Sequence, residues 1–132
     1  MIDMDQIIIK GSMKALLRAQ QGEIDAVLMY NKLAEIVSES DAAVFKQLAS
    51  EEGRHASVFH NYTKIVLKPK KTKSILIPFL YKTLGKERTY QLIANAEYSA
   101  AQKYKPLACT FQDVVTVMND ETCHGDMVSA LR

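Results

Sequence analysis

The sequence predicts an all-α protein in which four helices form an antiparallel bundle. Four segments place apolar residues at alternating steps of three and four, the spacing of residues that face the core of a bundle. Few helix breakers interrupt these segments, since the chain has only three prolines. With 48% hydrophobic and 24% charged residues, the chain can bury a full core. Its 132 residues correspond to a single domain, residues 1–132.

The first two helices are bounded by polar residues and a proline. The first is expected at about residues 12–37, where the polar stretch 38–41 ends it and offers an N-cap for the next helix. The second is expected at about residues 41–67, before Pro69. The connection that follows, residues 68–85, is long and is expected to contain a short helix of its own.

The last two helices are bounded by other signals. The third should start near Lys86 and kink or stop at Pro106. Thr110 and Asp113 have the spacing of a capping box, so the fourth helix is expected to begin there and to run to the carboxyl terminus.

The core-facing residues of each predicted helix form a seam along it. Each seam carries a glutamate near its middle, and two seams carry a histidine one turn later. No lysine or arginine occurs on any of the four seams. Burying one unpaired carboxylate costs several kcal/mol, so four in one core need compensation that two divalent cations can supply. The sequence therefore predicts a two-metal site formed by Glu23, Glu52, His55, Glu97, Glu121 and His124.

The register of the helices agrees with this site. In an antiparallel pair, two residues face each other when the turn lies midway between them. The midpoint between Glu23 and Glu52 falls beside the expected turn at residues 38–41, and the midpoint between Glu97 and Glu121 falls immediately before Thr110. Both pairs are therefore expected at one level of the bundle.

Two E-x-x-H motifs strengthen the prediction. Glu52–His55 and Glu121–His124 are each three residues apart, so both side chains of a motif lie on one face of a helix. The third histidine, His60, follows His55 by five residues and points elsewhere, so we expect it not to bind metal.

An internal repeat adds candidates around the site. A tyrosine follows the first glutamate of each half by seven residues, and an acidic residue precedes each E-x-x-H glutamate. The acidic residues are expected either to accept a hydrogen bond from a ligand histidine or to be solvated, and the tyrosines either to contact the site or to close the core. These four residues are Tyr30, Glu51, Tyr104 and Asp120.

This order of motifs resembles the ferritin-like di-iron carboxylate superfamily, most closely its rubrerythrin branch, from about residue 15 to residue 131. The resemblance implies a ferritin-like bundle running up-down-down-up, with a long crossover between the second and third helices. It also implies the ligand roles: Glu23 and Glu97 match terminal ligands, Glu52 and Glu121 match bridging ones, and the histidines are His55 and His124.

The chain departs from rubrerythrins in two ways. It has no C-x-x-C motif of a rubredoxin domain, and alanines occupy positions 94 and 100, where a further glutamate is usual. These differences favour iron oxidation or iron binding over peroxidase activity. Demethoxyubiquinone hydroxylases share the six ligands, and the crossover at 75–85 is similar to theirs. Similar domains also occur attached to membrane iron transporters.

Three functions are therefore considered. The first is an oxidoreductase that couples Fe(II) oxidation to the reduction of dioxygen or hydrogen peroxide. The second is a non-catalytic iron-binding or iron-sensing module serving a partner or a membrane iron transporter, and the third is a quinone-type monooxygenase. An oxygen-rich site with two imidazoles suits two iron ions, with manganese as the next candidate and zinc less suited.

Partners and location follow from charge and composition. A net charge of +2 does not indicate nucleic acid, and a homodimer is expected because a small bundle gains from further apolar burial. The amino terminus does not have the pattern of a secretory signal, which favours a cytoplasmic protein. Seven lysines and no acidic residue occur in residues 53–86, beside the apolar run 75–81. This segment could contact an anionic membrane, but packing of the run on the bundle or in a dimer is preferred.

Overall fold

The computed structural model describes residues 3–132, without the side chains of residues 5–10. The described part of the chain is helical and contains no strand. Its five helices are α1 (Met4–Ala34), α2 (Glu39–Thr63), α3 (Thr72–Leu84), α4 (Lys86–Thr110) and α5 (Val114–Ala130). The sequence-based prediction of an all-α ferritin-like bundle is confirmed.

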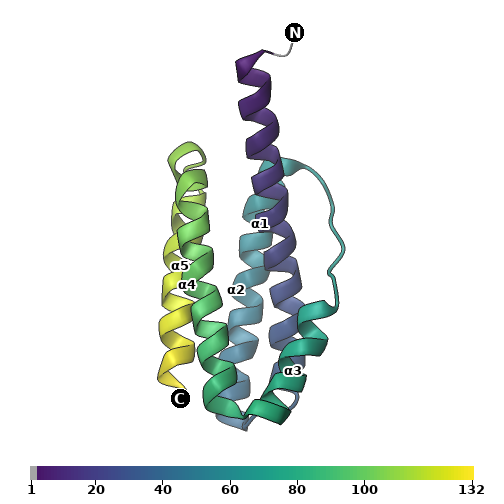
Figure 1. The fold of residues 1–132 in the computed structure, drawn as a ribbon, viewed down its shortest axis with the longest axis vertical. Helices are drawn as coiled ribbons and strands as arrows, with labels where there is room; N and C mark the ends of the chain where they lie inside the picture. Colours follow the sequence, from purple (N-terminus) through teal and green to yellow (C-terminus); the bar gives the residue numbers. More distant parts are fainter. Residues whose placement is uncertain (1–2) are drawn as a thin grey trace.

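The bundle consists of two antiparallel hairpins, α1 with α2 and α4 with α5 (Figure 1). After α2 the chain returns along the outside of α1 in an extended segment and then in α3, so that α4 runs parallel to α2. This is the expected up-down-down-up order, with α3 as the short helix of the crossover. Gly85 joins α3 to α4 with a φ of +89°, a conformation that favours glycine.

The helices differ from the expected boundaries at several ends. α1 begins at Met4 and ends at Ala34, whereas residues 12–37 were predicted. α2 ends at Thr63, four residues before the predicted end, because Lys64 adopts the left-handed conformation and donates its N–H to His60 O. The chain then turns away from the bundle, and Val66, which lies within the predicted second helix, is 84% exposed. The expected N-cap is present, since Ser38 Oγ accepts a hydrogen bond from Asp41 N.

The junction between α4 and α5 also differs from the prediction. α4 continues through Pro106 to Thr110, because Pro106 lies on the exposed side and the next residue, Leu107, packs into the core. The predicted capping box at Thr110 is wrong. Thr110 is the last residue of α4, and α5 begins at Val114 without a side-chain cap from Asp113. That aspartate instead accepts a hydrogen bond from Tyr62 Oη.

Two apolar layers fill the bundle, one on each side of its middle. The first lies toward the α1–α2 turn and contains Tyr30, Phe45 and Tyr90, with ring centroids 5.7 and 5.1 Å apart along this series. The second lies toward the α4–α5 turn and contains Phe59 and Tyr104 at 5.2 Å. The layers leave a polar level between them, which is where the sequence places the metal site.

The apolar run of the crossover is divided between two faces of α3. Ser74 is buried and Ile77 and Tyr81 pack on the core, as the preferred interpretation of this run requires. Ile75 and Phe79 remain 67% and 59% exposed. None of the described helices is long and apolar enough to span a membrane.

Candidate metal centre

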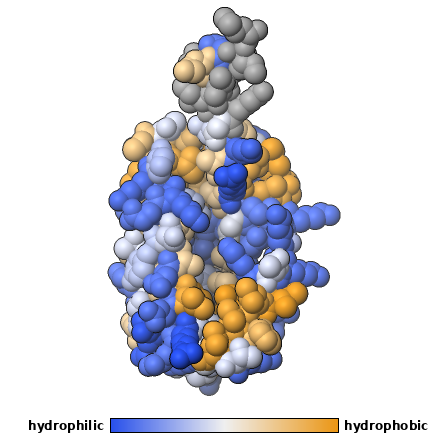
Figure 2. Space-filling model, in the orientation of Figure 1, coloured by the Kyte–Doolittle hydropathy of each residue, from blue (hydrophilic) through white to orange (hydrophobic). Residues whose placement is uncertain are grey.

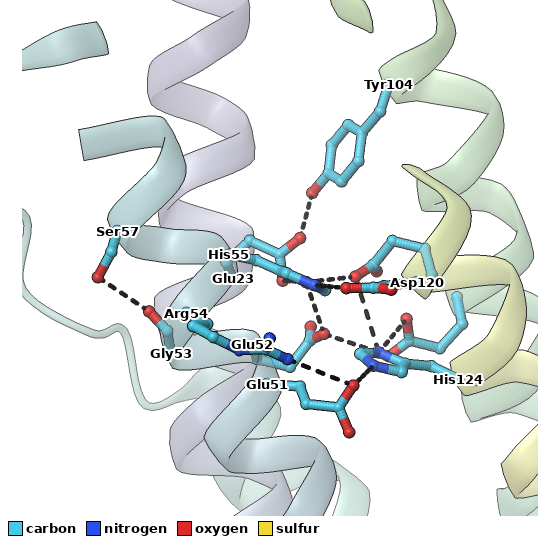
Figure 3. A network of polar contacts seen from close by, with 12 residues as sticks. Glu23, Glu51, Glu52, Gly53, Arg54, His55, Ser57, Tyr104, Asp120 and His124 are labelled. Carbon is cyan, nitrogen blue, oxygen red and sulfur yellow. Dashed lines mark hydrogen bonds and ion pairs between the residues drawn. The ribbon is translucent and has the colours of Figure 1, made fainter. Parts of the chain in front are cut away.

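All six predicted ligands meet at the polar level of the bundle. Figure 3 labels four of them, Glu23, Glu52, His55 and His124. Their exposed fractions range from 0% to 6%, so every one of them is withdrawn from solvent. One glutamate comes from each of α1, α2, α4 and α5, and the two histidines come from α2 and α5. The residues are Glu23, Glu52, His55, Glu97, Glu121 and His124.

Glu52 and Glu121 lie between the two histidines. Glu52 Oε1 is 3.3 Å from His55 Nδ1 and 2.9 Å from His124 Nδ1. Glu121 Oε1 is 2.9 Å from His55 Nδ1 and 3.7 Å from His124 Nδ1. One ligand atom from each of these four residues falls within a group spanning at most 4.8 Å. This central position is the one that a carboxylate bridging two metals would need.

Glu23 and Glu97 each approach only one histidine. Glu23 Oε2 is 3.8 Å from His55 Nδ1, and Glu97 Oε2 is 3.6 Å from His124 Nδ1. The centre thus divides into two equivalent halves, each with its own glutamate and histidine, which share Glu52 and Glu121. This twofold arrangement corresponds to the internal repeat of the sequence, with one half from each hairpin.

The atoms of the centre lie 2.9–3.8 Å from one another, but at angles that are poor for hydrogen bonds. Within the part of the chain that the structure describes, six buried side-chain atoms lack a hydrogen-bond partner, and five of them belong to this centre. A buried polar atom without a partner is costly and therefore rare. Carboxylate oxygens and imidazole nitrogens that point at a common space fit two divalent metal ions. The five atoms are Glu52 Oε1, His55 Nδ1, Glu97 Oε2, Glu121 Oε1 and His124 Nδ1.

The other ring nitrogen of each histidine is held by an acidic residue from the opposite hairpin. His55 Nε2 lies 2.8 Å from Asp120 Oδ2, and His124 Nε2 lies 3.2 Å from Glu51 Oε1. When Nε2–H donates a hydrogen bond to these carboxylates, the proton of the neutral ring is on Nε2 and the lone pair of Nδ1 is directed into the centre. A metal ligand requires this tautomer. The crosswise pairing was not predicted from the sequence, although both acidic residues were candidates.

The two tyrosines of the repeat hold Glu97 and Glu23, also crosswise. Tyr30 of α1 donates a hydrogen bond to Glu97 Oε1 of α4, and Tyr104 of α4 donates one of 3.0 Å to Glu23 Oε1 of α1. Each tyrosine also packs in one of the apolar layers. Both roles considered for these tyrosines are therefore present in the structure.

Without metal, protons replace part of the missing positive charge. Burial raises the pKa of Glu23 well above its usual value and that of Glu121 to about 12. Burial opposes protonation of His124, but the carboxylates of Glu52 and Glu97 raise its pKa to about 10. The seams thus contain a cation that the sequence-based reasoning overlooked, the imidazolium itself. Metal binding must displace these protons, because only the deprotonated groups can be ligands.

His60 lies outside the centre, as expected. It is partly buried and lines a small surface pocket on the outer side of α2, together with Gln20 and Leu67. The sequence-based reasoning missed another feature, a groove that reaches the centre between α1 and α4. Its signal in the sequence is a row of small residues on the first helix, Ala15, Ala19, Gly22 and Ala26.

The fold and the arrangement of the centre define a class, the ferritin-like bundles with a buried carboxylate–histidine group. The sequence model of the rubrerythrin family matches residues 14–131. The chain therefore belongs to the rubrerythrin family. Neither a curated protein nor a solved structure matches the sequence significantly.

Proposed function

We propose that the six residues bind two iron ions and that the protein is an oxidoreductase coupling Fe(II) oxidation to the reduction of dioxygen or hydrogen peroxide. The observation that carries the proposal is the group of five unpartnered buried atoms directed at one space. Four carboxylates balance the charge of two divalent ions, so binding of two such ions would leave the core without excess charge. Oxygen ligands with two imidazoles favour iron, with manganese as the next candidate.

The six residues would hold two Fe(II) ions, which would supply one electron each; with two protons, these two electrons suffice to reduce one hydrogen peroxide molecule to two waters. The protein holds the ligands for this reaction in place. Asp120 and Glu51 fix the ring orientation of the histidines, and Tyr30 and Tyr104 fix the terminal carboxylates. The apolar layers above and below close the centre toward the two ends of the bundle, and the groove between α1 and α4 reaches it from the side.

Anaerobic titration with Fe(II) followed by rapid mixing with an oxidant tests the proposal. We expect two Fe(II) per chain to bind and to be oxidised quickly by peroxide or dioxygen, as followed by the absorbance of the ferric product. Binding of two ions without turnover would instead support the iron-binding or iron-sensing module. Failure to bind two ions would reject the site.

The groove between α1 and α4 favours one second candidate, a monooxygenase that acts on an organic substrate. Small oxidants do not need a cavity of about 830 Å³, the volume of this groove. The test is incorporation of oxygen from labelled dioxygen into an added organic compound by the iron-loaded protein.

A further inference from the structure

The groove connects the molecular surface to the proposed metal centre. Its volume of about 830 Å³ falls within the range of about 300–1,000 Å³ typical of small-molecule pockets. α1 and α4 form its two walls, α3 borders one end, and Glu23, Glu52, Glu97 and Glu121 form part of its floor. In Figure 2 a pale strip runs down the middle of this face between hydrophilic borders, with an apolar area over α3 below it.

The groove stays open although its walls carry small side chains. Ala19 and Gly22 of α1 face Ala96 and Ala100 of α4 across it. Two helices with small facing residues can normally pack closely, yet α1 touches α4 far less than it touches α2. The hydrogen bonds from Tyr30 to Glu97 and from Tyr104 to Glu23 span this space and hold the walls at a fixed separation.

The charges along the groove are unevenly distributed. Its exposed charged residues, Arg18, Lys73 and Lys103, are all cations, whereas its carboxylates are buried at the floor. Among the side chains that the structure describes, no ion pair neutralises these three cations. They therefore present a positive border to a ligand.

Two of the cations, Arg18 and Lys103, and two exposed leucines mark opposite ends of the groove, whereas the third cation, Lys73, lies in α3 on the leucine side. Arg18 precedes Glu23 in α1 and Lys103 follows Glu97 in α4, so both lie on the side of the centre that faces the α4–α5 turn. Leu92 precedes Glu97 in α4 and Leu76 belongs to α3, so these leucines, each 47% exposed, lie on the other side. Lys103 and Leu92 are eleven residues apart on one helix, which corresponds to about 16 Å. A ligand that contacts the two cations at one end and the leucines at the other is narrow and apolar, with an anionic group at one end.

We infer that this groove binds a long-chain carboxylate, with its head group at Arg18 and Lys103 and its hydrocarbon chain running past the metal centre toward Leu76 and Leu92. A second copy of the chain is a poorer occupant, because a symmetric contact would bring the same cations together. The inference concerns binding and holds for the protein with or without iron, so it can fail or succeed independently of the proposed function.

Binding is measured on the metal-free and on the zinc-loaded protein by the fluorescence of cis-parinaric acid, a long-chain carboxylate. Hexadecanoate and hexadecanol serve as competitors with the same chain and different head groups. We expect saturable binding of one molecule per chain and stronger competition by hexadecanoate. Ala96→Phe narrows the groove from its exposed wall and should weaken binding about tenfold or more. Ala43→Phe, at an exposed alanine of α2 outside the groove, should not change it.

The double substitution Arg18→Gln with Lys103→Gln tests the head-group site. It should weaken hexadecanoate binding about three- to tenfold and leave hexadecanol unaffected. The pair Lys46→Gln with Arg88→Gln makes the same charge change outside the groove and should have no effect on either ligand. Absence of saturable binding, or equal loss in the control variants, would overturn the inference. It would also be overturned if sedimentation showed a dimer that Ala96→Phe dissociates without weakening ligand binding.

Discussion

Tyr104 Oη donates a 3.0 Å hydrogen bond to Glu23 Oε1 across the space between α4 and α1. The bond joins the two hairpins at the level of the candidate metal centre and orients the carboxylate of Glu23. Its counterpart from Tyr30 does the same for Glu97. The positions of Glu23 and Glu97, two of the proposed ligands, therefore depend on tyrosines outside the proposed ligand set.

Replacing Tyr104 with Phe should lower metal affinity, because Glu23 loses the donor that orients it. Loss of such a partner typically costs about 10- to 100-fold in affinity. Competition with a metal chelator measures the change. Tyr62→Phe is the matched control, since Tyr62 also donates to an acidic residue but does so outside the centre, to Asp113. Equal affinities of the Tyr104 variant and the wild type would show that this hydrogen bond does not position a ligand.

Replacing Glu121 or Glu52 with Ala should leave fewer than two metal ions per chain and lower the melting temperature of the metal-loaded protein. Both carboxylates lie between the two histidines, so each loss affects both halves of the centre. Metal analysis and thermal unfolding measure the effect, with Glu87→Ala, an exposed glutamate of α4, as the control. If Glu121→Ala retained two ions, the arrangement proposed for the centre would be wrong.

Substitution of each histidine tests which histidines bind metal. His55→Ala and His124→Ala should each weaken metal binding, because each removes an Nδ1 directed into the centre. His60→Ala should leave metal binding unchanged, because His60 lines a separate pocket on the outer side of α2. Isothermal titration with Mn(II), which avoids iron oxidation, provides the comparison. Loss of metal in the His60 variant would contradict the site.

The stability of the metal-free protein should fall as pH rises. The pKa of His124 increases from its usual 6.5 to about 10 on folding, so its stabilising contribution is complete below pH 6.5 and is lost as pH approaches about 10. The pKa of Glu121 is raised from its usual 4.5 to about 12. This residue therefore also lowers the stability of the folded protein as pH rises above 4.5. Thermal unfolding with a chelator should show this decrease between pH 6.5 and 10. The Mn(II)-loaded protein should lack it, since its ligands are already deprotonated; parallel curves would contradict this prediction.

Self-association should involve the exposed apolar face of α3. Ile75 and Phe79 are 67% and 59% exposed, and burying them would stabilise a small bundle. Sedimentation at micromolar concentration should show a dimer that Phe79→Ser weakens and Val115→Ser, at an exposed valine of α5, does not. Salt should strengthen the dimer by screening nearby lysines. A monomer that instead binds anionic vesicles, and loses that binding in salt, would assign this face to a membrane.

Several features were determined by the sequence alone. The alternating spacing of apolar residues defined the helices, and four glutamates with two E-x-x-H motifs on those seams defined the six residues that the structure brings together. This worked because helical periodicity fixes which side chains share a face, and a buried charge without compensation is too costly to occur by chance. The helix ends were less predictable. α2 stops early, and Gln20, a residue distant in sequence, donates a hydrogen bond to Ile65 O just beyond its end. α4 continues through Pro106, which lies on the exposed side of the helix.

Only the tertiary structure decided how the two hairpins are joined. Local spacing placed Asp120 and Glu51 near the centre, but the pairing of Asp120 with His55 and of Glu51 with His124 depends on how α2 lies against α5. The groove is likewise a property of the separation between α1 and α4, since the same alanines would line a closed interface if these helices were closer. Periodicity specifies the face that a residue occupies, whereas the partner of that face and its distance result from the packing of the whole bundle.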